Sequence, residues 1–229
     1  MLLGLSLYSQ DSVNDDPETM LNSINYHIAQ AQADVDNGNY YNAQKKLEEA
    51  LKQAEKINDK KSIGLIHSKI GKIHYLLEEP TDAMVSLTKA VEVQRFAKDY
   101  LNIADTYKTL GNVHMFKKNY EEALDYYKSA KSLFEQENLD NFVAEILLFQ
   151  GKAYNGQSKF REARTVLEQC ITQAKRLGLK EIHSNALVNL GKAQLELGKN
   201  DEALQLASEG YNIARANNFP TSISEGLIV

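Results

Sequence analysis

The chain has 229 residues, of which 43% are hydrophobic and three are proline, and its 26 Lys and Arg face 31 Asp and Glu, for a formal net charge of −5. This length and apolar content suit one large domain or two small ones, and they exclude a disordered chain. The mild acidity without a Lys/Arg cluster argues against nucleic-acid binding. The single Cys170 excludes a disulfide framework or a Cys-based zinc site. No run approaches the roughly 20 apolar residues of a membrane span.

Residues 1–16 differ in composition from the rest of the chain. An apolar run from Leu2 to Tyr8 is followed by Ser9-Gln10 and then by acidic residues. This order resembles the end of a secretory signal peptide, but the charged amino-terminal region is missing. Two interpretations stay open. Residues 1–10 are a signal-peptide remnant of an exported, periplasmic protein, or they form an apolar arm that packs on the first helix of a cytoplasmic one.

From residue 17 onward the sequence repeats with a period of 40 residues. The columns that define this period are Gly71, Gly111, Gly151 and Gly191, with Ala31 in the first repeat, and Ala43, Ala83, Ala123, Ala163 and Ala203 twelve residues later. A fixed period of this size is typical of solenoids, in which each unit buries its apolar face against its neighbours. We therefore expect a solenoid over residues 17–229, with repeats at about 17–59, 60–99, 100–139, 140–179 and 180–219.

Two further columns predict where helices pack closely. One holds small residues: Ala50, Ala90, Ala130, Cys170 and Gly210. The other is mostly large and apolar: Leu47, Leu87, Tyr127, Leu167 and Ala207. Small residues that recur in register indicate that two helices approach each other closely at that level.

Within a repeat the periodicity is helical, as the third repeat illustrates. Ile103, Tyr107, Leu110 and His114 follow one another at spacings of 3 or 4, which predicts a helix over about 101–117. A second helix is expected from about Tyr120 to Gln136, with an inner stripe formed by Ala123, Leu124, Tyr127, Ala130 and Phe134. Short polar turns join the helices, and no strand-like alternation competes. The sequence therefore predicts an all-α fold of antiparallel helix hairpins.

The carboxyl terminus resembles the opening of a sixth repeat over residues 220–229. Ile223 falls in the column of Ile63, Ile103 and Val143, but the segment stops before its glycine. It is either the start of a repeat cut short or a shortened cap. Because a cap should present a polar outer face and Leu227-Ile228-Val229 is apolar, we favour a fragment of a longer protein.

These columns resemble the tetratricopeptide repeat family. The shared features are the Leu-Gly pair, an aromatic or similar residue three positions later, and Glu-Ala-Leu at the start of the second helix, as in Glu122-Ala123-Leu124 and Glu202-Ala203-Leu204. The 40-residue period resembles the long variant found in polarity scaffolds and bacterial signalling proteins. The resemblance implies a right-handed α-α superhelix that binds proteins or peptides. The first and fifth repeats depart from the pattern at Asp34 and Gln194, as expected of end units.

No catalytic or metal-binding constellation is found. His67 and His74 fall in columns shared with aromatic and aliphatic residues, so we interpret them, with His114, as packing residues. Cys170 lies in the small-residue column, where a buried thiol is inert. No nucleophile, base and orienting group can be assembled. We therefore expect no enzyme activity, no cofactor and no metal.

A binding surface is expected on the first helices of the hairpins, which line the concave side in the family that the chain resembles. The candidate contact residues are Lys72, Tyr75, Lys108, Asn112, Met115, Phe116, Lys152, Asn155, Asn189 and Lys192. Apolar anchors beside lysines suit a peptide that carries acidic and apolar groups. In the alternative interpretation Leu76 and Phe116 are buried under the turn and the lysines are only solvated.

The family's clamp for a peptide carboxy terminus is matched only in part. Lys108 and Asn112 fit its first pair, but Lys152 stands where an Asn is required, and Asn185 and Asn189 stand where cations are required. The function expected is a non-catalytic protein- and peptide-binding module, the sensory or scaffolding part of a larger bacterial signalling protein. The alternative is a free-standing adaptor that self-associates, or binds a folded partner, through its carboxy-terminal end.

Overall fold

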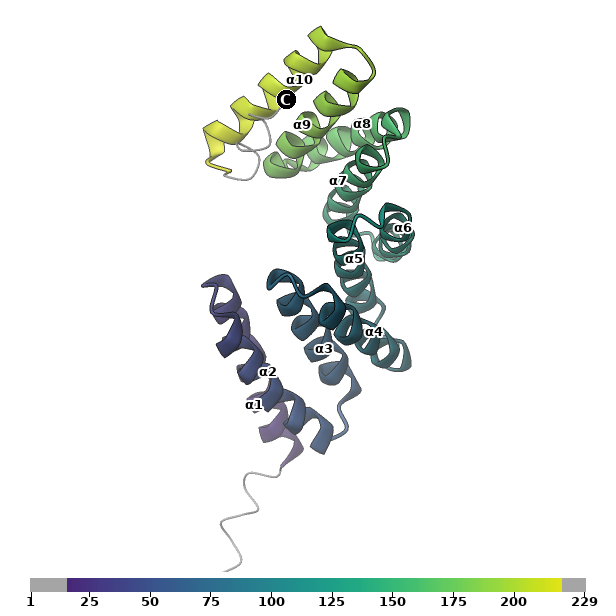
Figure 1. The fold of residues 1–229 in the computed structure, drawn as a ribbon. Coiled ribbons are helices and arrows are strands. Elements are labelled where there is room, and N and C mark those ends of the chain that lie inside the picture. The colour runs from purple at the N-terminus through teal and green to yellow at the C-terminus, as the bar shows by residue number, and fades with distance from the viewer. Residues whose placement is uncertain (1–15, 220–229) are drawn as a thin grey trace, which may run out of the picture. The chain divides into compact units, whose positions relative to one another are not determined.

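The computed structural model describes residues 16–219, and all regular structure within them is α-helical (Figure 1). The helices are α1 Pro17–Asp36, α2 Tyr40–Lys56, α3 Lys60–Leu76, α4 Pro80–Phe96, α5 Tyr100–Phe116, α6 Tyr120–Gln136, α7 Asp140–Gly156, α8 Phe160–Leu177, α9 Lys180–Glu196 and α10 Asn200–Asn217. The predicted all-α fold is confirmed, and both helices predicted in the third repeat lie within one residue of their expected bounds. The predictions on the amino-terminal run and on the sixth repeat lie outside the described residues.

The turns between helices share one backbone geometry. A residue with positive φ stands at every twentieth position: Gly38, Asn58, Glu78, Lys98, Lys118, Asn138, Ser158, Gly178, Gly198 and Asn218. After α3, the N–H of Glu78 donates to the carbonyl of Tyr75 at 3.1 Å and that of Glu79 to the carbonyl of His74 at 2.9 Å. Such bonds satisfy the last carbonyls of a helix. Each 40-residue repeat therefore consists of two helix-and-turn segments of equal length.

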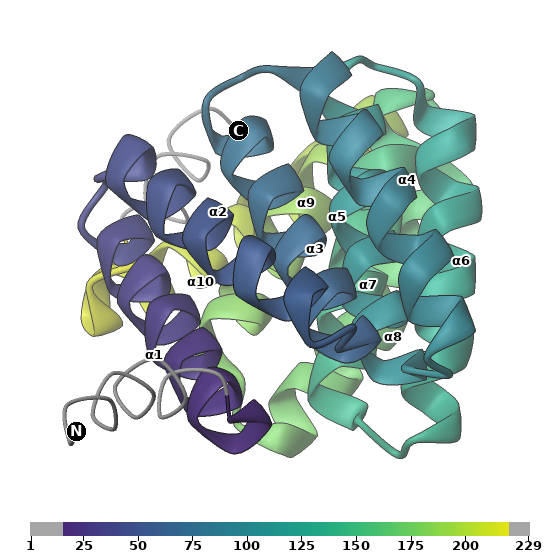
Figure 2. The ribbon, with the colours of Figure 1, turned by 90° about the horizontal axis from the view of Figure 1, so that it is seen from below.

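The helices form two compact units whose boundary falls inside α5, between Thr106 and Tyr107. In the first unit α1 packs on α2, α2 on α3 and α3 on α4. Figures 1 and 2 show α2 lying beside both α1 and α3. In the second unit α6 to α10 pack in chain order, and α7 also contacts α9. None of the helices in the described part of the chain is long and apolar enough to cross a membrane.

Paired helices touch at the glycine column that defines the period. A Cβ added at Gly71 would lie 2.5 Å from Leu87 Cγ, and one at Gly151 would lie 2.5 Å from Leu167 Cγ. At Gly111 it would lie 2.6 Å from Cδ1 of Tyr127. The large residues predicted in register therefore pack directly on the glycines sixteen positions earlier. Because the predicted inner stripe of α6 is also buried, these contacts form the core of each hairpin.

Candidate functional site

The ten predicted contact residues are divided between the two units. Lys72 and Tyr75 lie on α3 in the first unit, and the other eight lie in the second unit. Of the ten, Lys72 and Phe116 are exposed, Asn189 is buried, and the remaining seven are partly buried. Of the predicted contact lysines, Lys72 is therefore accessible, and Lys152 and Lys192 are accessible in part.

In the first unit, Lys72 stands beside a polar chain that links α3 to α1. The Lys69 ammonium donates to Gln32 Oε1 at 2.9 Å, and Gln32 Nε2 donates to Asp36 Oδ1 at 2.9 Å. Desolvation lowers the pKa of Lys69, and the positive charge of Lys72 lowers it further, while Asp105 acts in the opposite direction. The cavity next to these lysines holds about 10 Å³, room for roughly one water molecule, so it is no pocket for a small ligand.

Two apolar side chains that the alternative interpretation placed under the turns are instead accessible. Leu76 at the end of α3 is 38% exposed, and Phe116 at the end of α5 is 48% exposed. The interpretation that both are buried is therefore wrong. Each side chain can serve as an apolar contact within its own unit.

Lys108 and Asn112 are held by partners within the second unit. The Lys108 ammonium donates to Glu145 Oε2 at 3.2 Å and lies 5.7 Å from the ring centre of Phe142. Asn112 Oδ1 accepts a hydrogen bond of 2.7 Å from the Tyr127 hydroxyl. These contacts fix the two side chains in place, and they bind the helix α5 to α6 and α7 rather than leaving a clamp free for a carboxylate.

An amide cluster joins α7 to α9. Asn155 Nδ2 donates to the backbone carbonyl of Asn189 at 2.9 Å, and Asn189 Nδ2 donates to that of Asn185 at 2.8 Å. Asn185 and Asn189 are only 8% and 5% exposed. Within the described residues, the buried side-chain oxygens Oδ1 of Asn155 and Asn185 have no hydrogen-bond donor. A buried acceptor without a donor costs about 1–3 kcal/mol, and because both oxygens are covered, a ligand N–H can reach them only after the amide side chains rotate outward.

Sequence reasoning did not find the whole of this cluster. Asn155 and Asn189 were predicted as contact residues, but Asn185 was considered only as a mismatch to a clamp. The structure brings Asn155, Asn185 and Asn189 together from α7 and α9. The 40-residue period does not specify which side chains of these two helices contact each other. Lys152 and Lys192 stand three residues from Asn155 and Asn189 on the same helices and are partly buried. A mixed amide and lysine surface results.

The buried histidines and the cysteine lie in packing positions. Burial lowers the pKa of His67 and of His114, which disfavours their charged forms. The Cys170 thiol is fully buried, contacts the Ala144 carbonyl at 3.3 Å, and has its pKa raised to about 12 by desolvation. Because the thiolate is the reactive form, this position is a poor nucleophile.

One cluster in the described part of the chain has the composition of a metal site. His74 at the end of α3, with Glu79 and Asp82 at the start of α4, places one ligand atom from each residue within 4.8 Å of the other two. His74 was predicted from the sequence to be a packing residue, and the two carboxylates were not expected beside it. The side chain of His74 is partly accessible and contacts Glu79.

The sequence pattern of the tetratricopeptide repeat matches residues 62–136, 102–176 and 142–216, three segments that start 40 residues apart. No curated protein sequence gives a significant match.

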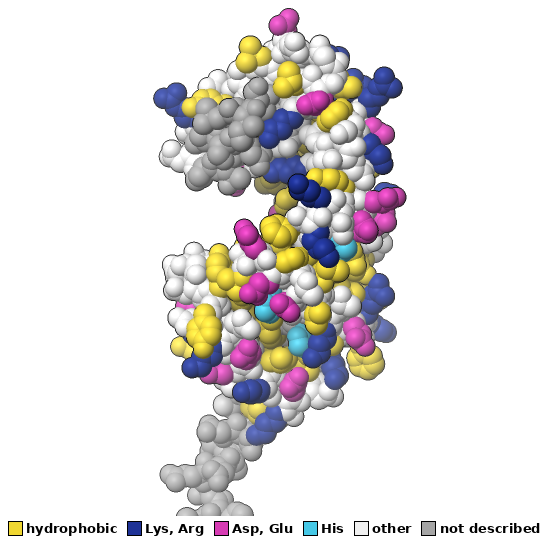
Figure 3. All heavy atoms as spheres, viewed as in Figure 1, with side chains coloured by type: hydrophobic (Ala, Val, Ile, Leu, Met, Phe, Trp, Pro, Cys, Tyr) yellow, Lys and Arg dark blue, Asp and Glu magenta, His cyan; other side chains and the backbone are white. Residues whose placement is uncertain are grey.

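Figure 3 shows side chains of both charge signs and hydrophobic side chains interspersed over one face of each unit, a pattern that by itself singles out no ligand.

Solved structures similar to this chain have helical repeats of the same kind. BtubC (BKLC) from P. vanneervenii superposes with a TM-score of 0.80 at 18% identity, over 89% of this chain and 84% of its own. A signal-transduction ATPase with numerous domains and a tetratricopeptide repeat sensor, from Pyrococcus horikoshii, gives 0.78 at 18% identity, over 91% and 33%. A Rap protein in complex with competence and sporulation factor gives 0.76 at 14% identity, over 91% and 58%.

At these identities the likeness establishes the fold, which is the α-α solenoid expected from the sequence. This chain spans only a third to a little over half of the second and third of these proteins. The pattern match covers more than half of the 229 residues and reproduces the 40-residue period, and such repeats are consistent with a role in protein–protein interaction. The chain belongs to the tetratricopeptide repeat family.

Proposed function

We propose that this chain is a non-catalytic protein- and peptide-binding module, and that the amide cluster on α7 and α9 is part of its peptide site. The observation that supports this most is the pair of buried acceptors, Asn155 Oδ1 and Asn185 Oδ1, which have no donor within the described residues. Peptide backbone N–H groups are donors of the required kind. Because both oxygens are covered in the free chain, the proposal requires the two amide side chains to rotate toward the bound segment, whose N–H groups then supply the missing donors.

The neighbouring side chains define the peptide class. Lys152 and Lys192 are partly accessible cations on the same two helices, so the ligand should carry carboxylate groups. Leu195, exposed at the end of α9, offers an apolar contact. Exposed charge pairs are individually worth little, about 0–1 kcal/mol, so the lysines select acidic sequences and speed association while the buried amides and apolar contacts supply the affinity.

The biological setting that we propose is the sensory or scaffolding part of a larger bacterial signalling or regulatory protein. Two of the similar structures, the ATPase with a repeat sensor and the Rap protein, are considerably longer than the segment that this chain spans. A second candidate is a free-standing adaptor that self-associates, motivated by the apolar sequence Leu227-Ile228-Val229. A concentration-dependent dimer that Leu227→Asp disrupts would favour the adaptor, and a monomer at all concentrations would remove it.

The peptide site is tested by selecting a random peptide library on the full chain and on a Lys152→Glu, Lys192→Glu double variant. The control is a Lys128→Glu, Lys159→Glu variant, which has the same change in net charge at exposed positions on α6 and at the start of α8. We expect acidic, partly apolar peptides to be enriched by the wild type and the control and lost by the first variant. If no sequences are enriched, or if both variants lose them equally, the site is not on α7 and α9.

A further inference from the structure

An imidazole and two carboxylates converge at the turn between α3 and α4. His74 Nδ1 lies 2.7 Å from Glu79 Oε2, and ligand atoms of His74, Glu79 and Asp82 all lie within 4.8 Å of one another. Two atoms bound to one metal ion at 2.0–2.2 Å stand about 3 Å apart. The observed separations therefore need only small side-chain rotations to bring all three atoms onto one ion.

The backbone of the turn holds these side chains together. The Glu79 N–H donates to the His74 carbonyl at 2.9 Å, which fixes the position of Glu79 relative to the last turn of α3. Glu79 is the residue before α4, yet its side chain makes no capping bond to that helix and is directed to His74 instead. Pro80 fixes the first dihedral of α4, and Asp82 follows within the first turn.

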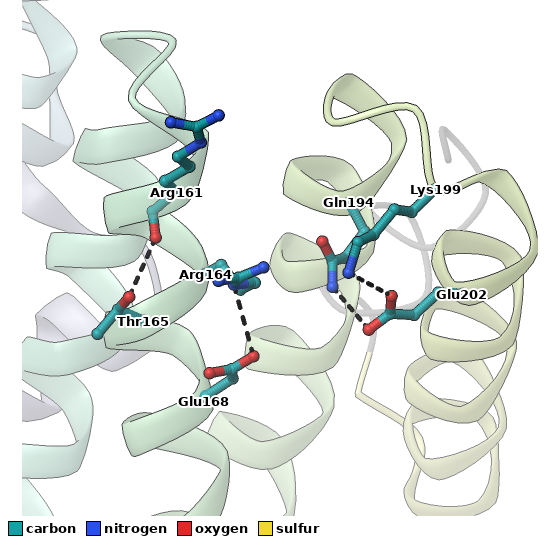
Figure 4. A network of polar contacts seen from close by, with 7 residues as sticks. All are labelled: Arg161, Arg164, Thr165, Glu168, Gln194, Lys199 and Glu202. Carbon is teal, nitrogen blue, oxygen red and sulfur yellow. Dashed lines mark hydrogen bonds and ion pairs between the residues drawn. The ribbon is translucent and has the colours of Figure 1, made fainter.

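The fifth repeat shows what the same three positions do when one of them is a cation. There Gln194, Lys199 and Glu202 stand where the second repeat has His74, Glu79 and Asp82. Figure 4 shows Lys199 and Gln194 converging on Glu202, with Lys199 Nζ 3.1 Å from Oε2 and Gln194 Nε2 2.6 Å from Oε1. In the fifth repeat the Lys199 ammonium thus places a positive charge beside the Glu202 carboxylate.

The second repeat replaces that lysine with a further carboxylate. Two negative charges and one imidazole then share the turn at which the fifth repeat has an ammonium and one carboxylate. In the other repeats the corresponding sets contain at most one carboxylate: Asp34, Asn39 and Asn42; His114, Asn119 and Glu122; Tyr154, Lys159 and Glu162. The combination of a histidine with two carboxylates is therefore confined to one of five equivalent turns.

We propose that His74, Glu79 and Asp82 bind a divalent transition-metal cation of the Zn²⁺ class. One imidazole nitrogen with two carboxylates is a donor set for such ions, with water completing the coordination. The cation offsets the repulsion between the carboxylates in the way that Lys199 supplies positive charge beside Glu202. Because the ligands come from two helices, the bound ion ties α3 to α4 across their turn and stabilises that hairpin.

The first experiment titrates Zn²⁺ into the full chain by calorimetry and follows the thermal unfolding midpoint. We expect one site on the wild type, lost or weakened by roughly tenfold or more in His74→Gln and in Glu79→Lys, with the Zn²⁺-induced rise in midpoint lost as well. Lysine already stands at the position of Glu79 in the fourth and fifth repeats, as Lys159 and Lys199, so we expect Glu79→Lys to fold. The matched control, Asn119→Lys at the same position of the third repeat, should bind Zn²⁺ as the wild type does.

The second experiment transfers the site within the chain. In a His74→Gln background, the triple change Gln194→His, Lys199→Glu and Glu202→Asp should restore one Zn²⁺ site of similar affinity. Co²⁺ absorption bands should appear in the wild type, vanish in His74→Gln, and return in the transplant. Absence of binding by the wild type, or binding that survives both His74→Gln and Glu79→Lys, would overturn the assignment.

Discussion

Substitution of Gly111 by alanine tests the packing on which the repeat depends. An added Cβ would lie 2.6 Å from Cδ1 and 2.9 Å from Cζ of Tyr127. That ring is fully buried, stacks on Phe149 with centroids 5.6 Å apart, and has its hydroxyl bonded to Asn112. Because the ring is rigid and held on two sides, it can move only by giving up these contacts.

The expected cost follows from three opposing contributions. Overpacking a core costs about 1–3 kcal/mol, and loss of the tyrosine hydrogen bond adds about 1 kcal/mol. Alanine in place of glycine inside a helix returns about 1 kcal/mol. We therefore expect Gly111→Ala to lower the free energy of unfolding by about 1–3 kcal/mol, measured by circular dichroism in urea.

Gly191→Ala is the matched control, because Ala207 stands where the third repeat has Tyr127. Its added Cβ would lie 3.1 Å from the Ala203 carbonyl oxygen and 3.6 Å from Ala207 Cβ, so only small shifts are needed. The gain in helix propensity should then keep its unfolding free energy within about 1 kcal/mol of the wild type. Equal losses in Gly111→Ala and Gly191→Ala would refute the steric explanation.

A double-mutant cycle sharpens this test. In the fifth repeat Ala207 stands opposite Gly191, and a Cβ added at that glycine would lie 3.6 Å from Ala207 Cβ. A small side chain at position 127 should therefore leave room for alanine at position 111. In a Tyr127→Ala background, Gly111→Ala should cost at least about 1 kcal/mol less than in the wild type. An unchanged cost would show that the strain lies elsewhere than in the ring.

Three further outcomes are expected. Burial lowers the folded-state pKa of His67 and His114. Their contribution to stability is therefore full above the ordinary histidine pKa of about 6.5 and is lost as the pH falls below that value. The urea concentration at the unfolding midpoint should decrease on acidification, and it should decrease less in His67→Gln. Cys170, with its pKa raised to about 12, should resist thiol reagents in the folded protein and react once urea unfolds it, and rapid labelling without urea would contradict its burial. Lys98 has a left-handed φ of 54°, so Lys98→Gly should raise the unfolding free energy by up to about 1 kcal/mol. Gly198 has a φ of 78°, so Gly198→Ala should lower the unfolding free energy by a similar amount. Both changes are measured by unfolding in urea.

Much of the fold was predictable because it is encoded locally and repeated five times. The glycine and alanine columns gave the period, and the large apolar column placed Leu87, Tyr127 and Leu167 in register. That these side chains pack on the glycines sixteen residues earlier emerged only from the structure. The common turn was not predictable in the same way. Six of the ten left-handed positions in the described residues are glycine or asparagine, which favour that conformation. The other four, Glu78, Lys98, Lys118 and Ser158, carry no sequence signal for it.

The candidate sites were predictable only in part, since they depend on side chains from different helices. The period places Lys152 and Lys192 in one column, but it does not reveal that Asn155 bonds to the backbone of Asn189 on the next first helix. For His74, the equivalent positions His114 and Tyr154 pointed to packing. The carboxylates that approach it come from the following helix, and only the folded turn brings them together.

The central claim, that α7 and α9 hold a peptide site, is tested most directly by the affinity of a library-selected peptide. Its dissociation constant is measured by fluorescence anisotropy for the wild type, Asn155→Leu and the Lys128→Glu, Lys159→Glu control, at low and physiological salt. We predict roughly tenfold or weaker binding in Asn155→Leu, since a lost hydrogen bond to a buried group costs about 1–3 kcal/mol, and unchanged binding in the control. Equal affinity for all three proteins would contradict a peptide site at the amide cluster.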